Sequence, residues 1–293
     1  MIDGIIIKGI GGFYYVDTEN GLYECRARGI FRKEKVVPLV GDNVKIGIVD
    51  EENKKGVVEE IFERETELIR PPIANVNKAI IVFAIKNPSP NLSLLDRFIV
   101  LAEKEGLEIV IVLTKVDLST TEEVDRIKNI YELSGYKVIP VSNKENLNID
   151  KIKEELSNNI VVFAGPSGVG KSSLLNHIDT NFKLQTGEVS DKIKRGKHTT
   201  RHAELLKLEC GGMVADTPGF SSLTLDDIDE SELKEYFIEF ENHDECRFGS
   251  RCIHENEPSC AVKEAVENGE ISKKRYDSYI QLLNEIRSGK RRY

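Results

Sequence analysis

A glycine-rich segment near the middle of the chain has the composition and spacing of a phosphate-binding loop. It matches the pattern G-x-x-x-x-G-K-[ST] and reads Gly165-Pro166-Ser167-Gly168-Val169-Gly170-Lys171-Ser172. An apolar run, Ile160–Ala164, precedes it, and an amphipathic run follows from Ser173. In this setting backbone N–H groups surround phosphate, Lys171 reaches the β- and γ-phosphates, and the Ser172 hydroxyl binds Mg²⁺. We therefore expect a nucleoside triphosphate site that extends to Ser173, with Lys171 as a catalytic residue. The alternative is a chance glycine-rich turn.

A second motif predicts that the base is guanine. Thr114-Lys115-Val116-Asp117 matches [N/T]-K-x-D and directly follows an apolar run, where a parallel sheet places its ligand loops. The Asp117 carboxylate can accept two N–H bonds from guanine, whereas adenine lacks that pair of donors. Thr114 keeps a hydroxyl but lacks the amide of the more common Asn, which leaves its bracing of the loop open. The backbone of Ser142, after the next apolar run, is expected to support the base contact.

A third motif predicts the nucleotide switch. Asp216-Thr217-Pro218-Gly219 matches D-x-x-G, in which Asp216 binds Mg²⁺ through water and the Gly219 N–H senses the γ-phosphate. The stretch 196–200, which contains His198, Thr199 and Thr200, lies where the first switch belongs. One of its threonines should complete the Mg²⁺ shell, and we favour Thr200 over Thr199.

The order of the three motifs and one residue type depart from the usual GTPase pattern. The base motif precedes the phosphate loop, so the order is circularly permuted and D-x-x-G leads straight into the C-terminal region. Phe220 stands where a Gln commonly orients the attacking water. Another group must then assist hydrolysis, or hydrolysis is slow. His198 is the candidate, since a neutral imidazole can accept from water; the alternative is that His198 is only a polar residue of the switch.

A cluster of cysteines near the C-terminus predicts a structural Zn²⁺ site. Its pattern is C-x₅-C-x-H-x₅-C, and its members are Cys246, Cys252, His254 and Cys260. Three thiolates and one imidazole suit closed tetrahedral coordination. His243 is a competing ligand, and packing of reduced cysteines as small apolar residues is the alternative.

Composition and apolar patterning predict a cytoplasmic protein of several domains. The chain has 293 residues and a net charge of −9. Its most apolar runs, residues 79–85 and 109–113, are much shorter than the roughly 20 residues that a membrane helix needs. Short β-rich runs occupy residues 1–65, alternating strands and helices residues 66–225, and a helical pattern with the cysteine cluster residues 226–293. We take these ranges as three domains.

The acidic charge argues against nucleic-acid binding unless basic residues gather locally. The stretch 26–35 holds five basic residues around Phe31, and a basic, aromatic loop on a small barrel is typical of nucleic-acid-binding OB-folds. A solvated charged loop is the alternative. Further basic residues lie near the C-terminus, at Lys273–Arg275 and from Lys290 to Arg292.

Together these motifs resemble the ribosome-small-subunit-dependent GTPase A family over nearly the whole chain. TKVD, GPSGVGKSS, GKHTTR, DTPGF and the Cys/His cluster carry the resemblance. It implies an all-β OB-fold barrel at the N-terminus, a central α/β permuted GTPase domain and a mostly helical zinc domain. It also implies GTP and GDP with Mg²⁺, one Zn²⁺, and His198 as the position associated with catalysis.

The resemblance further implies a role in late maturation of the small ribosomal subunit. The partners would be the 30S subunit and its 16S rRNA, with GTP hydrolysis stimulated by the subunit; we expect a monomer. Two other functions remain as hypotheses: a GTP-dependent binding switch with negligible hydrolysis, which Phe220 suggests, and an ATP-dependent small-molecule kinase, since such kinases share the phosphate loop.

Overall fold

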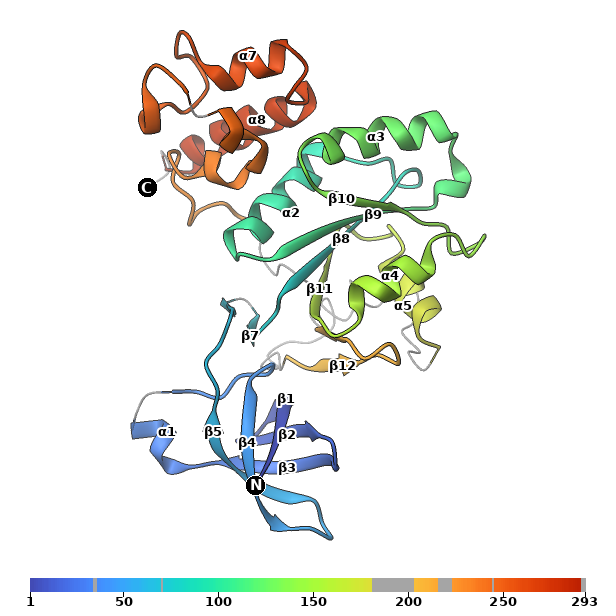
Figure 1. Cartoon of the computed structure of the whole chain (residues 1–293), viewed down its shortest axis with the longest axis vertical. Coiled ribbons are helices and arrows are strands. Elements are labelled where there is room, and N and C mark those ends of the chain that lie inside the picture. The colour runs from blue at the N-terminus through green and yellow to red at the C-terminus, as the bar shows by residue number, and fades with distance from the viewer. Residues whose placement is uncertain (34–35, 70, 181–202, 216–222, 244, 291–293) are drawn as a thin grey trace.

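The computed structural model of the chain describes residues 1–33, 36–69, 71–180, 203–215, 223–243 and 245–290. Figure 1 shows three parts in chain order: a β-barrel, a sheet flanked by helices, and a helical C-terminal part. The expected fold class is confirmed. Among the described helices, none has both the length and the apolar character that a bilayer crossing requires.

The N-terminal part is a closed five-stranded barrel with the order β1-β2-β3-β5-β4. Alternate residues such as Ile6, Val16, Tyr23 and Val44 point inward and are fully buried, as a half-buried strand pattern requires. The elements are β1 (Ile2–Ile10), β2 (Phe13–Thr18), β3 (Gly21–Ala27), α1 (Gly29–Lys33), β4 (Asn43–Asp50) and β5 (Lys55–Ile61).

The central part contains a six-stranded sheet with the order β10-β9-β8-β11-β13-β12. All neighbours are parallel except β12, which pairs antiparallel with β13. A short hairpin of β6 (Glu67–Ile69) and β7 (Pro72–Ala74) links it to the barrel. The strands are β8 (Lys78–Ala84), β9 (Glu108–Thr114), β10 (Lys137–Pro140), β11 (Ile160–Ala164), β12 (Leu205–Lys207) and β13 (Met213–Ala215).

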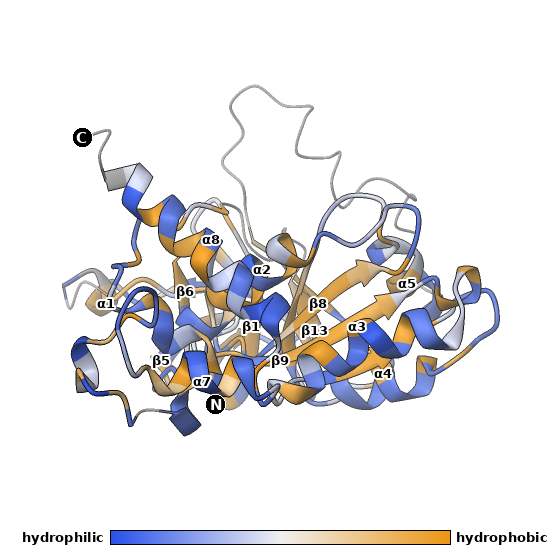
Figure 2. Cartoon of the chain, turned by 90° about the horizontal axis from the view of Figure 1, so that it is seen from above, coloured by the Kyte–Doolittle hydropathy of each residue, from blue (hydrophilic) through white to orange (hydrophobic). Residues whose placement is uncertain are grey.

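Helices cover both faces of this sheet because its central strands are apolar on both sides. Ile81 and Phe83 of β8 pack with α2 (Leu92–Lys104) and α3 (Thr121–Leu133). Ile80 and Val82 pack instead with α4 (Ile149–Leu156) and α5 (Lys171–Ile178). Figure 2 shows β8 and β13 coloured as hydrophobic among helices that carry both colours.

The C-terminal part packs its own apolar core against α2. Phe237, Tyr279, Leu282 and Leu283 are fully buried in that core, which also includes Val100 of α2. Within the helical pattern expected for residues 226–293, residues 233–243 form two 3₁₀ segments and no α-helix. The elements are η2 (Leu233–Tyr236), η3 (Ile238–His243), η4 (Gly249–Arg251), α7 (Ala261–Glu267) and α8 (Lys273–Lys290).

A buried ion cluster joins α8 to α2 and corrects one expectation. The guanidinium of Arg275 is fully buried, with Nη1 2.7 Å from Asp96 Oδ1 and Nε 2.7 Å from Glu239 Oε1. Arg275 is therefore not part of a basic surface for nucleic acid. Likewise, Arg287 forms ion pairs with Glu230 and Glu255, so its charge is offset within the chain.

Candidate nucleotide site and metal centre

The phosphate loop connects β11 to α5 in the central sheet, and close backbone packing explains its glycines. At Gly165, a Cβ would lie 2.1 Å from the Val82 carbonyl oxygen, so only glycine fits. Gly170 has a φ of 101° and directly precedes α5. The loop thus presents N–H groups at the start of a helix, which is the arrangement that binds phosphate.

Lys171 is the cation of this loop, and its ammonium group lies inside it. Its Nζ donates to the carbonyl oxygens of Gly165 and Pro166, both at 2.7 Å. Burial lowers the pKa of Lys171 to about 8. These two carbonyl oxygens hold the ammonium group within the loop. Phosphate oxygens of a bound nucleotide could replace them as its hydrogen-bond acceptors.

The base loop after β9 is tied directly to the phosphate loop. The Thr114 hydroxyl donates to the Val169 carbonyl oxygen at 2.5 Å, and Lys115 Nζ donates to the Gly168 carbonyl oxygen at 2.7 Å. Lys115 Nζ also contacts the Asn87 carbonyl oxygen, a contact that the sequence did not indicate. Thr114 therefore braces the loop with its hydroxyl.

Asp117 and Ser142 are hydrogen-bonded through their side chains, a contact that the sequence did not indicate. The Ser142 hydroxyl donates to Asp117 Oδ1 at 2.7 Å, and Ser142 is fully buried. Asp117 lies in η1 (Val116–Leu118) and is partly exposed. The hydroxyl binds one carboxylate oxygen and so restricts the orientation of the Asp117 carboxylate.

Several expected site residues lie outside the described residues. They are His198, Thr199, Thr200, Asp216, Gly219 and Phe220. The strands that flank them are described: β12 begins at Leu205 and β13 ends at Ala215, so the D-x-x-G motif begins at the carboxyl end of β13. β13 is the neighbour of β11, which precedes the phosphate loop.

The four expected metal ligands lie together in the C-terminal part. Their ligand atoms are all within 4.8 Å of one another, and all four residues are buried. Cys246 Sγ lies 3.8 Å from Cys260 Sγ and 3.6 Å from His254 Nδ1. Sulfur atoms at about 2.3 Å from a tetrahedral zinc would be about 3.8 Å apart, so the donor set fits this metal. Burial lowers the pKa of His254 to about 4, which keeps the imidazole neutral as a ligand must be.

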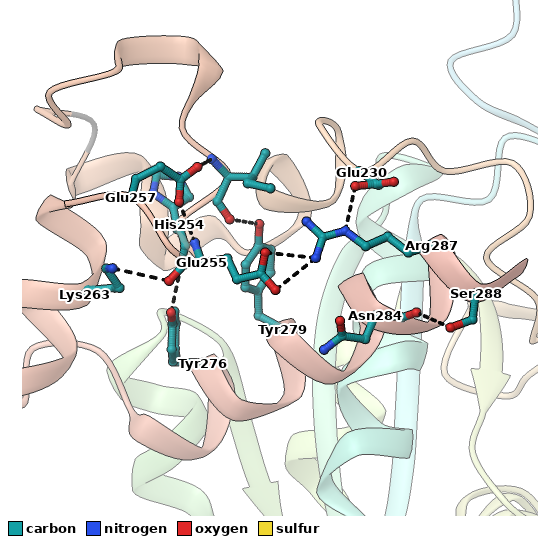
Figure 3. A network of polar contacts seen from close by, with 11 residues as sticks. Glu230, His254, Glu255, Glu257, Lys263, Tyr276, Tyr279, Asn284, Arg287 and Ser288 are labelled. Atoms are coloured by element: carbon teal, nitrogen blue, oxygen red, sulfur yellow. Dashed lines mark hydrogen bonds and ion pairs between the residues drawn. The ribbon is translucent and has the colours of Figure 1, made fainter. Parts of the chain in front are cut away.

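Helix α8 fixes the backbone around the imidazole ligand. The Tyr276 hydroxyl donates to the His254 carbonyl oxygen at 2.7 Å, and the Tyr279 hydroxyl donates to the Ile253 carbonyl oxygen at 2.6 Å. Figure 3 shows both tyrosines with Arg287, which binds Glu255 and Glu230. The metal loop and α8 therefore form one unit.

The barrel carries a hollow of about 390 Å³ near the basic loop. Arg26 and Arg28 line it together with Phe13, and the Arg26 guanidinium lies 4.8 Å from the centre of the Phe13 ring. Arg28 also pairs with Glu59 at 2.7 Å. Phe31, the aromatic of the basic stretch, is only 7% exposed and belongs to the core cluster, and it lines the hollow together with Phe13.

Comparison with known proteins finds matches along the chain. A model of the RsgA GTPase family matches residues 61–226, and a model of the RsgA N-terminal domain matches residues 3–58. The small ribosomal subunit biogenesis GTPase RsgA of Alkaliphilus metalliredigens is 52% identical and covers 99% of this chain and 100% of its own. That of Caldanaerobacter subterraneus subsp. tengcongensis is 51% identical and covers 100% of this chain and 98% of its own.

Two solved structures agree with the fold. YjeQ from Thermotoga maritima has a TM-score of 0.84 at 40% identity and covers 97% of this chain and 98% of its own. YloQ, described as a circularly permuted GTPase, has a TM-score of 0.82 at 41% identity and covers 98% of this chain and 96% of its own.

Proposed function

The chain belongs to the RsgA GTPase family, and we propose that it binds the small ribosomal subunit and assists its late maturation. In this proposal it hydrolyses GTP to GDP and phosphate, with stimulation by the subunit. It acts as a monomer in the cytoplasm, where subunits mature. Family membership decides against the kinase hypothesis, since the relatives are named GTPases.

One observation carries the nucleotide half of the proposal: the base and phosphate loops form a single bonded unit. Thr114 and Lys115 donate to carbonyl oxygens of the loop that Lys171 closes. The site comprises residues 114–117, Ser142 and residues 165–173. In the proposal Thr200, Asp216 and Gly219 complete it around Mg²⁺ and the γ-phosphate, and His198 orients the attacking water in place of the missing Gln.

The barrel supports the ribosomal half of the proposal. The chain as a whole is acidic, with a net charge of −9, so contact with rRNA must use a local basic surface. Arg26 beside Phe13 at the hollow offers a cation and an aromatic face, which suit phosphate and an unpaired base respectively. We therefore assign the contact with 16S rRNA to the barrel domain, which comprises residues 1–65. The GTPase domain, residues 66–225, follows it in the chain.

The C-terminal domain, residues 226–293, holds one structural Zn²⁺ in this proposal. Cys246, Cys252, His254 and Cys260 present a donor set that fits a closed tetrahedral site. The metal would fix the loop that α8 frames, and the four protein ligands leave no coordination position for a substrate. His243 lies in η3 and is not among the four grouped ligands.

Co-sedimentation with purified 30S subunits tests the binding proposal. We expect the chain to pellet with 30S subunits in the presence of a non-hydrolysable GTP analogue and to be largely released with GDP. Arg26→Glu should weaken pelleting and make it more sensitive to salt, while exposed Lys151→Glu on α4 serves as the charge-matched control. Failure of the unaltered chain to pellet with either nucleotide would contradict the ribosomal role.

A further inference from the structure

A short connector carries the chain from the D-x-x-G segment into the C-terminal domain, and it lies along α2. We define this connector as residues 223–228. Leu223 packs against the large core cluster of the barrel and sheet, whereas Leu225 and Ile228 are buried in the C-terminal core. The connector therefore passes from one packed body to the other, and the permuted order of the motifs makes it the direct covalent route between them.

Arg97 of α2 bonds to the start of this connector and to α8 at the same time. Its Nη1 donates to the Leu223 carbonyl oxygen at 2.8 Å and to Glu285 Oε1 at 2.7 Å. Its Nη2 contacts the other oxygen of the Glu285 carboxylate, and the Arg97 side chain is only 16% exposed. A planar guanidinium with two parallel bonds to a carboxylate has little freedom, so the three groups keep a fixed relative placement.

The end of the connector is held on the same helix. Lys104 Nζ donates to the Asp227 carbonyl oxygen at 3.2 Å, and Lys104 follows Arg97 by seven residues, or about two helical turns. The connector is thus bonded to one side of α2 at both of its ends. Of the two basic residues, Arg97 is the one that also holds a carboxylate of α8.

Attachment of the C-terminal domain does not depend on Arg97. The fully buried Arg275 already joins α8 to Asp96, and Phe237, Tyr279 and Leu283 form an apolar core beside it. Loss of the Arg97 contacts should therefore leave the domain in place. The loss removes the hydrogen bond from Arg97 to the Leu223 carbonyl group and the ion pair between Arg97 and Glu285.

We propose that Arg97 is a positioning residue for GTP hydrolysis, which couples the D-x-x-G segment to α8. Leu223 is four residues beyond Gly219, and four residues span at most about 14 Å. By its contact with Leu223, Arg97 therefore anchors the chain at a point no more than about 14 Å from Gly219. Because the same guanidinium holds Glu285, a displacement of α8 moves this anchor point. The inference rests on the proposed function, since it assigns regulation to the proposed nucleotide site.

Single-turnover GTP hydrolysis with hydrogen exchange tests this assignment. Arg97→Gln removes the charge and the fork, and Arg126→Gln removes an exposed arginine from the neighbouring helix α3 as a matched control. For Arg97→Gln we expect the hydrolysis rate to fall at least about tenfold, since a misplacement of about 1 Å can cost up to about a hundredfold. The GDP dissociation constant should stay within about twofold.

Hydrogen exchange supplies the readout that a purely structural role would not change. In the unaltered chain, exchange in residues 223–228 and 273–290 should differ between a GTP analogue and GDP, and Arg97→Gln should abolish the difference in α8. Glu285→Ala leaves Arg97 able to bond to Leu223 but removes its partner on α8, and it should also abolish the exchange difference, which covers the case that Arg97→Gln folds poorly.

The outcomes separate this inference from the proposed function. An Arg97→Gln rate within about twofold of the Arg126→Gln rate would overturn it, as would a rate loss matched by an equal loss of GDP affinity. An α8 exchange difference that persists in Glu285→Ala would overturn the coupling. If the unaltered chain itself failed to hydrolyse GTP with 30S subunits, the proposed function would fail and the inference with it.

Discussion

The Thr114 hydroxyl donates a hydrogen bond to the Val169 carbonyl oxygen at 2.5 Å, and this bond joins the guanine loop to the phosphate loop. Thr114 is only 3% exposed. Its hydroxyl also lies 3.3 Å from the Phe83 carbonyl oxygen, but one proton serves one strong bond, and the shorter contact is to Val169. The two halves of the nucleotide site are therefore linked although the first residue of the base motif is not Asn.

Replacing Thr114 by Val should weaken nucleotide binding. The change keeps the shape of the side chain and leaves a buried carbonyl oxygen unpaired, which costs about 1–3 kcal/mol. We expect the GDP dissociation constant to rise about tenfold by isothermal titration calorimetry. Thr121→Val, at the exposed start of α3, is the control and should bind GDP like the unaltered chain. Equal affinities for the two variants would show that the bond does not support the site.

Nucleotide binding should weaken as the pH rises above about 8. Burial lowers the pKa of Lys171 to about 8, and the ammonium form is the one that attracts phosphate. Above that pH the free protein must take up a proton when it binds, so affinity falls by up to about tenfold per pH unit, while below about pH 7 it stays level. GDP titrations from about pH 6 to pH 9 measure this. Lys171→Arg, whose guanidinium stays charged, should bind with a flat profile over this range. A flat profile in the unaltered chain would contradict the role given to Lys171.

Removing Arg275 should destabilise the chain strongly. Its guanidinium is fully buried between Asp96 and Glu239, so Arg275→Ala leaves two carboxylates without their cation. Loss of one partner in a buried ion pair costs about 3–5 kcal/mol. Urea denaturation, followed by signals from α8, should show this loss in the free energy of unfolding. Lys273→Ala, whose side chain is 72% exposed, should cost less than about 0.5 kcal/mol. A similar, small effect for both variants would argue against the buried cluster.

Breaking the cysteine cluster should release the metal without abolishing nucleotide binding. Cys252 is fully buried among the other three ligands, and Cys252→Ser replaces a thiolate that zinc needs. We expect bound zinc to fall from one per chain to nearly none, with loss of structure in residues 245–260, since binding energy of a structural zinc is folding energy. GDP affinity should be unchanged. Cys210→Ser, outside the cluster, should keep its zinc; equal metal content in both variants would exclude the assigned ligand set.

Contiguous motifs let the sequence predict where the expected nucleotide loops lie. Residues 114–117 follow from the end of β9, and residues 165–172 connect the end of β11 to the start of α5. The four metal ligands also lie within fifteen residues, and the structure brings them together. By contrast, the contact of Lys115 with the Asn87 carbonyl oxygen joins two loops that no local pattern relates.

Side chains whose partners lie far along the chain could not be predicted. Arg275 belongs to a run of basic residues and looks solvent-exposed in sequence, but Asp96 lies 179 residues away and draws it into the interior. Phe31 stands among basic residues in the sequence, yet it belongs to the core cluster and is only 7% exposed. The parallel pairing of β5 with β3 could not be predicted either, because residues 28–54 separate these two strands, whereas β5 pairs antiparallel with its chain neighbour β4.

The most direct test of the account is GTP hydrolysis with and without purified 30S subunits, in the unaltered chain and in His198→Ala. Phe220 cannot orient water, so the unaltered chain should be slow alone. We predict stimulation of at least about a hundredfold by 30S subunits, and loss of most of it in His198→Ala with GTP binding retained, since general base assistance contributes about 10²–10⁴-fold. No stimulation, in a chain that still binds GTP, would contradict a ribosome-activated GTPase and favour a binding switch with negligible hydrolysis.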